Sequence, residues 1–321
     1  DAVIIATSGT SGLPKAVIHT HASVEASAVA TSKALDVDPS TDRWLACLPL
    51  AHIGGLAVVM RSMVTETPVE VHDRFDPRAV ISAAGAGATL VSLVTRALNQ
   101  VRPELFRTVL IGGGVPPPNR PANVIATYGM TETGSGIVYE TSLLDGAEIS
   151  IGPPGPATGR SASRGNRDET LGRPDGTAEI HLRGPMLFRG YRSRPDPFDR
   201  NGWFPTGDLG SWGPDGELVV IGRRGDLIVT GGEKVWPEPV ERLLLNRPDI
   251  AQVALIGRPD PEWGRKVVAV IVPAAGHVRP ALGDVREAVR AELPIWAAPK
   301  EIEFAEDLPR TALGKVRRNL L

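Results

Sequence analysis

The chain has 321 residues, of which 42% are hydrophobic and 22% are charged, so it can bury a sizeable core and is neither disordered nor fibrous. Its net charge is −2, from 35 basic and 37 acidic residues without a long run of one sign, which argues against an extended nucleic-acid-binding face. The sequence has no apolar run of the roughly 20 residues that a membrane-spanning helix needs and no secretory signal pattern. We therefore expect a cytoplasmic globular protein, and its length favours two domains.

Short apolar strands alternate with helical segments in the first part of the chain. A strand at 3–6, a loop rich in glycine and hydroxyl residues, and a second strand come first. Helices are then predicted over 23–35 and 54–64, and strands over 44–49, 69–71, 88–91 and 108–111. The lone Cys47 lies in an apolar run and predicts a buried structural thiol. Alternation of strands and helices is typical of a layered α/β sheet.

The second half of the chain changes character twice. Residues 152–176 are dense in proline, glycine, serine and arginine and predict a mobile surface loop, after which strands over 178–183 and 217–221 predict a smaller β-rich unit. Beyond Gly225, helices are predicted over 238–246 and 282–293, and strands over 252–256, 267–272 and 301–304. We therefore predict an α/β protein with a large layered N-terminal domain (1–224), which includes the β-rich subdomain, and a small α+β C-terminal domain (225–321).

Two segments carry most of the candidate chemistry. The loop from Thr7 to Lys15 supplies hydroxyls, backbone N–H groups that glycine leaves free to turn inward, and one cation, which is the chemistry of a phosphate cradle. It does not fit a Walker A loop. The pentapeptide 128–132, YGMTE, follows a predicted strand at 124–127 and so lies at the sheet edge where α/β folds bind ligands. Its tyrosine can stack on a base, its threonine can donate to a phosphate, and its glutamate can hold Mg²⁺.

Three further segments are weaker signals by themselves. Asp208 in Thr206-Gly207-Asp208 and Arg223 after Gly222 supply a carboxylate and a guanidinium that could fix ribose hydroxyls. Lys315 follows Gly314 near the end of the chain and is its last lysine.

In this order, these segments resemble the adenylate-forming superfamily of acyl-CoA synthetases, carrier-domain adenylation enzymes and luciferases. The resemblance runs from residue 2 to residue 321 and is carried by TSGTSGLPK, LPLAHIGGL, GGGVP, YGMTE, GWFPTGDLG, GRRGDLIVTGGEKVWPEPVE and PRTALGK. Within the superfamily, WLACLPLAHIGGLAVVMRSM and YGMTETGSGIVY are most similar to the o-succinylbenzoate-CoA ligases of menaquinone synthesis. The resemblance implies an ATP-dependent ligase that joins a small carboxylic acid to AMP and then to coenzyme A.

The resemblance also implies nucleotide-binding roles for individual residues. The β- and γ-phosphates would be held by Thr7, Ser8, Gly9, Thr10 and Lys15. The adenine would be bound by Gly113, Gly114 and Tyr128, the α-phosphate by Thr131, the Mg²⁺ by Glu132, and the ribose by Asp208 and Arg223.

The remaining roles that the resemblance implies concern the acid, coenzyme A and movement of the C-terminal domain. His52 matches the gate of the acyl pocket, and Arg61 matches the arginine that receives the second carboxylate of o-succinylbenzoate. Because Arg61 lies in an apolar helical segment, an unpaired guanidinium there would be costly, and an anionic or buried partner is expected. In the C-terminal domain, the implied positions are the catalytic Lys315, the hinge residue Gly225, and Gly231 and Gly232 in the pantetheine tunnel. This domain must turn to deliver and withdraw Lys315.

Several alternatives stay open on the sequence alone. The acid could be another carboxylic acid, or the acceptor could be the phosphopantetheine of a carrier protein. A non-catalytic nucleotide-binding relative is a third hypothesis, because we expect that residues which normally precede Asp1 are missing. The oligomeric state is also open, with a homodimer as one alternative.

Overall fold

The computed structural model describes residues 1–7, 15–114, 116–117, 119–154, 176–310 and 316–321. The chain divides into two compact units, one made of residues 1–206 and 212–218 and the other of residues 207–211 and 219–321. None of the helices that the described residues form is both long enough and apolar enough to span a bilayer. The domain boundary at 224/225, which follows from the expected hinge, stays a prediction.

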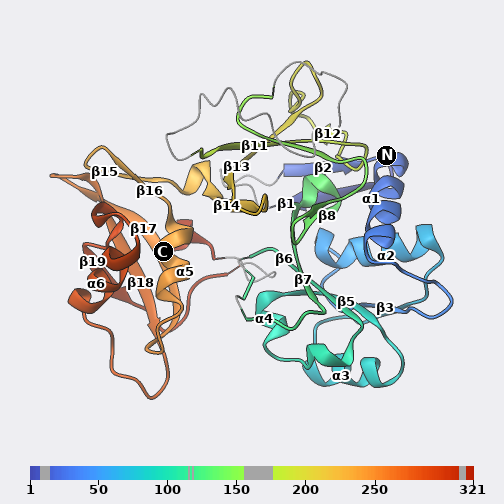
Figure 1. Ribbon diagram of the computed structural model, residues 1–321, viewed down its shortest axis with the longest axis horizontal. Coiled ribbons are helices and arrows are strands. Elements are labelled where there is room, and N and C mark those ends of the chain that lie inside the picture. Colours follow the sequence, from blue (N-terminus) through green and yellow to red (C-terminus); the bar gives the residue numbers. More distant parts are fainter. Residues whose placement is uncertain (8–14, 115, 118, 155–175, 311–315) are drawn as a thin grey trace. The chain divides into compact units, whose positions relative to one another are not determined.

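The first unit is built on a seven-stranded sheet with the order β4-β3-β5-β6-β7-β8-β9 (Figure 1). Its parallel strands are β3 (Trp44–Ala46), β4 (Val69–Val71), β5 (Leu90–Val94), β6 (Thr108–Gly112) and β7 (Val124–Met130). The strands β8 (Ser135–Tyr139) and β9 (Ser142–Leu143) extend the sheet in antiparallel fashion. A parallel sheet is buried on both faces, so its strands read as nearly continuous apolar runs. The layered α/β architecture is confirmed.

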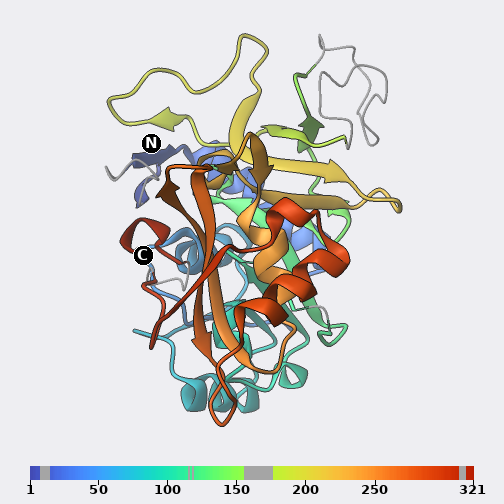
Figure 2. The ribbon, with the colours of Figure 1, turned by 90° about the vertical axis from the view of Figure 1, so that its left-hand side faces the viewer.

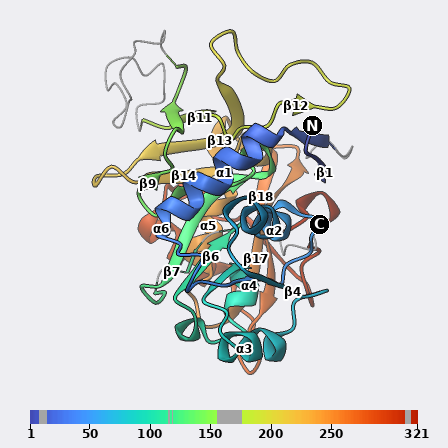
Figure 3. The ribbon, with the colours of Figure 1, turned by 90° about the vertical axis from the view of Figure 1, so that its right-hand side faces the viewer.

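Helices cover both faces of this sheet. On one face, α3 (Pro77–Gly85) and α4 (Thr95–Leu98) pack in a core that includes Val91 and Val109. On the other face, α2 (Ile53–Thr65) contacts β3, and α1 (His21–Ala34) packs beside α2 (Figure 3). Helix α1 begins with a capping box, because the Thr20 hydroxyl accepts from Ser23 N at 3.1 Å and the Ser23 hydroxyl accepts from Thr20 N at 3.0 Å.

Two smaller sheets are formed by strands that lie before residue 224. The strands β1 (Val3–Thr7), β2 (Lys15–His19) and β12 (Gly190–Tyr191) form one antiparallel sheet, and β2 is its central strand. A four-stranded sheet has the order β10 (Glu148–Ile151), β11 (Ala178–Arg183), β13 (Phe204–Trp212) and β14 (Leu218–Arg223). This second sheet contains both strands predicted for the β-rich subdomain. Most of the predicted loop 152–176 lies outside the described residues.

The second unit is an α+β structure (Figure 2). The strands β17 (Ile250–Asp260) and β18 (Gly264–Pro273) are antiparallel, and β19 (Glu301–Phe304) pairs with β18 in parallel. Alternate residues of β17 and β18 face the helices α5 (Pro237–Leu244) and α6 (Leu282–Glu292), where they form the main core. The other face of the sheet forms a smaller core with Leu308. A hairpin of β15 (Ile228–Thr230) and β16 (Glu233–Val235) completes the unit.

The largest difference from the predicted elements is at the YGMTE segment. The prediction that the strand ends at residue 127 is wrong, since β7 continues through Met130 and pairs with β8. Gly129 lies opposite Gly136, and a Cβ added at Gly129 would lie only 2.1 Å from the Ser135 carbonyl oxygen. Glycine has a low strand propensity. Gly129, which lets these strands approach each other, therefore makes the end of β7 hard to recognise as a strand in the sequence.

Candidate active site

The predicted adenine residues lie at one edge of the central sheet. Gly113 and Gly114 directly follow β6, Tyr128 lies in β7, and these two strands are parallel neighbours. The carboxyl ends of neighbouring parallel strands meet at the same sheet edge, where α/β folds bind ligands. Gly113 has a φ of +77° and a Cβ there would meet nothing within 4 Å, so the main chain is open to a flat ligand. The structure therefore places these three residues together.

The predicted catalytic pair, Thr131 and Glu132, lies on a tight turn after β7. This turn is the 3₁₀ helix η2 (Thr131–Thr133), and Gly134 ends it with a φ of +71°. The Thr133 hydroxyl accepts a hydrogen bond from Met130 N at 2.9 Å and lies 2.5 Å from the Ser135 carbonyl oxygen. The turn is thus fixed at both ends, and the Glu132 side chain is half-buried.

His19, at the end of β2, holds the turn from one side. Its Nε2 lies 2.7 Å from the Thr131 carbonyl oxygen, and its Nδ1 lies 3.2 Å from Ser23 Oγ. Because a carbonyl oxygen only accepts, Nε2 is the nitrogen that donates. Burial lowers the pKa of His19, while the bond to Thr131 and the charge of Glu132 act in the opposite direction. A buried, neutral histidine therefore joins β2 to the η2 turn.

Tyr191, in β12, holds the same turn from another side. Its hydroxyl donates to Glu132 Oε1 at 2.7 Å. The ammonium nitrogen of Lys15, the last residue of the predicted phosphate loop, lies 4.9 Å from the centre of the Tyr191 ring. The structure thus brings the predicted phosphate-binding lysine and the predicted magnesium ligand to the two ends of one tyrosine side chain.

The phosphate loop itself is described only at its two ends. Thr7 and Lys15 form the last pair of the β1–β2 hairpin, and Thr7 Oγ1 lies 3.4 Å from the Lys15 carbonyl oxygen. Ser8, Gly9 and Thr10 lie outside the described residues.

A magnesium ion fits the chemistry of the Glu132 turn. Within the described ranges, no group of three or more histidine, cysteine, aspartate or glutamate side chains could hold a metal ion by itself. Mg²⁺ is commonly held by one or two protein carboxylates together with water and substrate phosphates. A single half-buried carboxylate, whose partner Tyr191 also contacts Lys15, suits that mode of binding.

The second unit contains the predicted ribose pair, and the two residues are in contact. Arg223 Nε donates to Asp208 Oδ1 at 2.8 Å, and Asp208 is buried. Ionised partners make this a strong hydrogen bond, so the carboxylate is held in one orientation. Lys315 lies outside the described residues.

The glycines predicted for the hinge and the pantetheine tunnel differ in their surroundings. A Cβ at Gly225, in the 3₁₀ helix η3 (Arg224–Asp226), would meet nothing within 4 Å. Gly231 and Gly232 have φ values of +57° and +86° in the two-residue turn between β15 and β16, a type of hairpin turn that requires positive φ at both positions. A Cβ at Gly231 would also lie 2.6 Å from the Trp263 ring, so a structural need for glycine is clear there.

Arg61 is the most unusual residue of the first unit. It lies on α2, is only 2% exposed, and has no hydrogen-bond partner for Nε and Nη1. Its Nη2 reaches Ser135 Oγ at 3.4 Å, a long contact, and its guanidinium lies over the Trp44 ring. Burial lowers the pKa of Arg61, because the charged form loses its hydration. Among the described residues, no carboxylate pairs with Arg61, so the expected neutralising partner is not found there.

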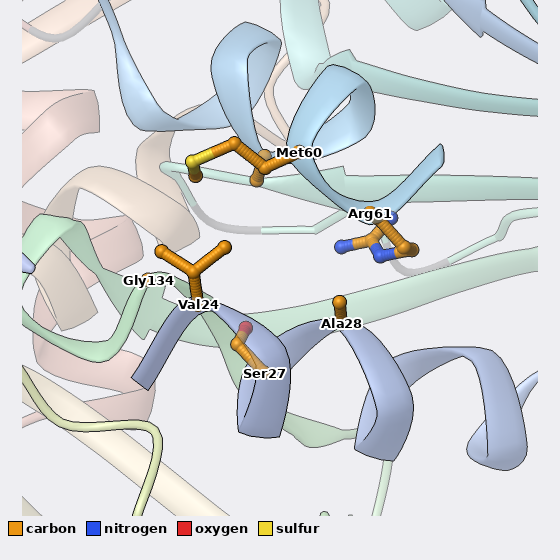
Figure 4. A pocket seen from close by; sticks show the side chains of 7 residues that line it. Val24, Ser27, Ala28, Met60, Arg61 and Gly134 are labelled. Atoms are coloured by element: carbon orange, nitrogen blue, oxygen red, sulfur yellow. The ribbon is translucent and has the colours of Figure 1, made fainter. Parts of the chain in front are cut away.

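A small cavity adjoins the Arg61 guanidinium (Figure 4). Its volume is about 10 Å³, which is room for about one water-sized group. It is lined by α1 and α2 residues and by the glycine after the η2 turn: Val24, Ser27, Ala28, Ala57, Met60, Arg61 and Gly134. His52, the N-cap of α2, is not part of this lining within the described structure.

Two residues of the site, His19 and Tyr191, were missed by the sequence analysis. His19 follows the apolar residues of β2, a position that indicates a core histidine. Tyr191 lies in a strand of two residues and is distant in sequence from Glu132 and Lys15. Its GY dipeptide carries no periodicity that would predict these contacts.

Comparisons with known proteins give consistent matches along the chain. The family model AMP-binding enzyme matches residues 1–192, and AMP-binding enzyme C-terminal domain matches residues 239–315. A 2-succinylbenzoate–CoA ligase of Bacillus anthracis (strain A0248) is 34% identical over 337 residues, which cover 99% of this chain and 69% of that protein.

Solved structures match over the same extent. The o-succinylbenzoate CoA synthetase from Bacillus subtilis in complex with the acyl-adenylate intermediate OSB-AMP has a TM-score of 0.83 and 31% identity, covering 98% of this chain and 68% of that one. The same synthetase in complex with ATP and magnesium ion has a TM-score of 0.81 and 30% identity, with the same coverage of both chains.

Proposed function

Because the chain belongs to the AMP-binding enzyme family, as an adenylate-forming acid:CoA ligase, we propose that it converts o-succinylbenzoate to o-succinylbenzoyl-CoA, a step of menaquinone synthesis. The family membership confirms the resemblance that the motifs carry. The names of the relatives support the proposed acid. We propose ATP as the nucleotide, Mg²⁺ as the metal ion and coenzyme A as the acyl acceptor of the protein.

The observation that carries the choice of acid is the state of Arg61. A buried guanidinium without a carboxylate partner is costly, and it becomes favourable when an anion fills the site. The cavity beside it is bounded by Gly134, which follows the catalytic turn directly. An acid with two carboxylates would place one near Thr131, where it reacts, and the other at Arg61, once the cavity of about 10 Å³ widens to admit a group larger than water. A monocarboxylic acid would leave Arg61 unpaired.

The proposed reaction has two steps. First, the substrate carboxylate attacks the α-phosphorus of ATP and pyrophosphate leaves. Then the thiol of coenzyme A attacks the carbonyl carbon of the mixed anhydride, and AMP leaves. Such chemistry depends on positioning and on neutralising phosphate charge.

Several of the predicted residues have a role in these steps. Lys15 and the loop that precedes it bind the β- and γ-phosphates, Thr131 donates to the α-phosphate, and Glu132 holds Mg²⁺, which supplies further neutralisation of phosphate charge. Asp208 and Arg223 hold the ribose. Lys315 bridges the acid and the α-phosphate in the first step, and the C-terminal unit withdraws it for the second.

Pyrophosphate release over a panel of acids tests the proposal. The panel contains o-succinylbenzoate, benzoate, and an aromatic acid whose second carboxylate is esterified, each with and without coenzyme A. We expect release with o-succinylbenzoate above the others and a thioester only when coenzyme A is present. Pyrophosphate release without thioester would indicate another acyl acceptor. Release with a different acid but not with o-succinylbenzoate would show that o-succinylbenzoate is not the substrate. No release with any acid would contradict catalysis.

A further inference from the structure

We propose that Tyr191 is a positioning residue that keeps the charges of Glu132 and Lys15 separate and available, the first for a metal ion and the second for phosphate. The inference rests on the proposed function, because it takes Glu132 as the magnesium ligand and Lys15 as a phosphate ligand. It adds a residue that neither the sequence motifs nor the comparisons assign to the site.

The hydrogen bond to Glu132 fixes one carboxylate oxygen and leaves the other available. Tyr191 Oη donates to Oε1 at 2.7 Å, and a bond to an ionised acceptor is stronger than one between neutral groups. Within the described residues, Oε2 of Glu132 receives no hydrogen bond. A phenol is neutral, so it orients the carboxylate without cancelling its charge.

The segment that carries Tyr191 also holds the main chain of Glu132. Phe188 N donates to the Glu132 carbonyl oxygen at 2.8 Å. The Phe188 ring, only 2% exposed, packs edge-on against the Tyr191 ring with centroids 4.8 Å apart. Tyr191 is in turn paired with Val17 of β2. The tyrosine is therefore fixed by packing and by strand pairing, as a residue that orients another must be.

The Tyr191 ring also contacts the lysine. Lys15 Nζ lies 4.9 Å from the ring centre, within the distance at which an aromatic ring attracts a cation. Although both residues contact Tyr191, the described structure contains no ion pair between Lys15 and Glu132. If these side chains paired directly, ATP and Mg²⁺ would have to break that ion pair before binding. The ring and its hydroxyl instead give each charge a neutral partner.

Two substitutions separate the roles of the ring and the hydroxyl. Tyr191→Phe keeps the ring beside Lys15 and removes the hydroxyl that donates to Glu132. In calorimetric titrations without any acid, so that no turnover occurs, we expect its affinity for ATP with Mg²⁺ to fall by about 10-fold, the usual effect of losing one bond to a charged group. Its affinity for ATP in the presence of a chelator should stay within about twofold of wild type. Tyr191→Leu should weaken both affinities.

The matched control is Tyr139→Phe, since the Tyr139 hydroxyl makes its hydrogen bond to Thr31 at 3.1 Å in the same unit. It should leave both affinities unchanged. A double-mutant cycle adds a second readout: in a Glu132→Gln background, Tyr191→Phe should no longer change the magnesium-dependent affinity.

The inference is overturned if Tyr191→Phe binds ATP with Mg²⁺ as wild type does, or if its loss is the same with and without Mg²⁺. It is also overturned if the loss persists unchanged in the Glu132→Gln background. Failure of the wild-type protein to bind ATP at all would instead overturn the proposed function, and the inference with it.

Discussion

The guanidinium carbon of Arg61 lies 4.7 Å from the centre of the Trp44 ring, and this contact is the main compensation that the described residues offer to a buried cation. Trp44 is itself fully buried in β3. Such a contact stabilises a cation by about 0.5–2 kcal/mol, and it does not neutralise the charge as a carboxylate would. Arg61 is therefore held in place at a cost in stability, which is typical of residues kept for a ligand.

Replacing Arg61 should accordingly not destabilise the ligand-free protein. Arg61→Met keeps much of the side-chain volume and removes two buried nitrogens, Nε and Nη1, that have no partner; an unsatisfied buried polar group costs about 1–3 kcal/mol. We expect the free energy of unfolding in urea, measured without any acid, to be no lower than that of wild type and to rise by up to about 1–3 kcal/mol. Arg43→Met, which breaks a half-exposed ion pair with Glu70, is the control. If Arg61→Met loses stability clearly and Arg43→Met does not, Arg61 must have a stabilising buried partner, contrary to the structure.

The same substitution should change the choice of acid. Arg61→Met should lower kcat/KM for o-succinylbenzoate by about 10- to 100-fold, the effect of losing a bond between charged groups. The value for a monocarboxylic acid should change far less. Steady-state kinetics with both acids measures the ratio, and an unchanged ratio would remove Arg61 from the acid pocket.

Stability should depend on pH through His19. Burial lowers the pKa of His19 below its ordinary value of 6.5, so the folded protein holds a neutral ring while the unfolded chain still takes up a proton. The stabilisation is present above about pH 6.5 and is lost as pH falls toward the folded pKa, by at most about 1.4 kcal/mol for each pH unit.

The test compares wild type with His19→Gln, which keeps a donor for the Thr131 carbonyl but does not titrate. Urea unfolding between about pH 7.5 and pH 5 should show a steeper loss of stability in wild type than in the variant. His21→Gln, at an exposed position at the start of α1, should follow wild type. Parallel curves for wild type and His19→Gln would show that His19 is not a buried neutral histidine.

Cys47 should be unreactive in the folded protein. Its side chain is buried, as its apolar neighbourhood predicted, and burial raises the pKa of the thiol to about 12. Alkylation needs the thiolate, which is then scarce at about pH 8.5. Because Cys47 is the only cysteine, mass spectrometry after iodoacetamide treatment reports on it alone. We expect modification only where urea unfolds the first unit, and rapid modification under native conditions would contradict the structure.

Lys315 should matter in one half-reaction only. Lys315→Ala should slow formation of the acyl-adenylate by about 100-fold or more, the usual effect of removing a group that stabilises transition-state charge. Thioester formation from supplied acyl-adenylate should stay within a few-fold of wild type. Lys266→Ala, which breaks an ion pair with Glu301 in the same unit, is the control. An equal loss in both half-reactions would contradict the proposed role of Lys315.

The layered fold could be predicted because several of its strands are apolar runs that can be recognised in the sequence. The segments LVSLV of β5 and TVLIG of β6 are continuous apolar runs, as strands covered on both faces must be. In contrast, β12 has only two residues and the end of β7 contains Gly129, so neither shows periodicity. Both of these elements shape the candidate site.

Prediction of the site had a similar limit. The motifs identified residues by type and order. In the structure Arg223 contacts Asp208, and Tyr128 lies on the strand beside the one that Gly113 follows, while their ligand-binding roles stay predictions. The contacts of Tyr191 and His19 depend on the pairing of strands that are distant in the sequence, and no local pattern encodes such pairing.

Mass spectrometry of the reaction shows whether this chain joins o-succinylbenzoate to AMP and then to coenzyme A, as we propose. With ATP, Mg²⁺ and the acid but no coenzyme A, we expect a mass equal to the mixed anhydride of o-succinylbenzoate and AMP. Adding coenzyme A should convert this species to the thioester and AMP. If no mixed anhydride forms with o-succinylbenzoate while another carboxylic acid yields its own, o-succinylbenzoate is not the substrate.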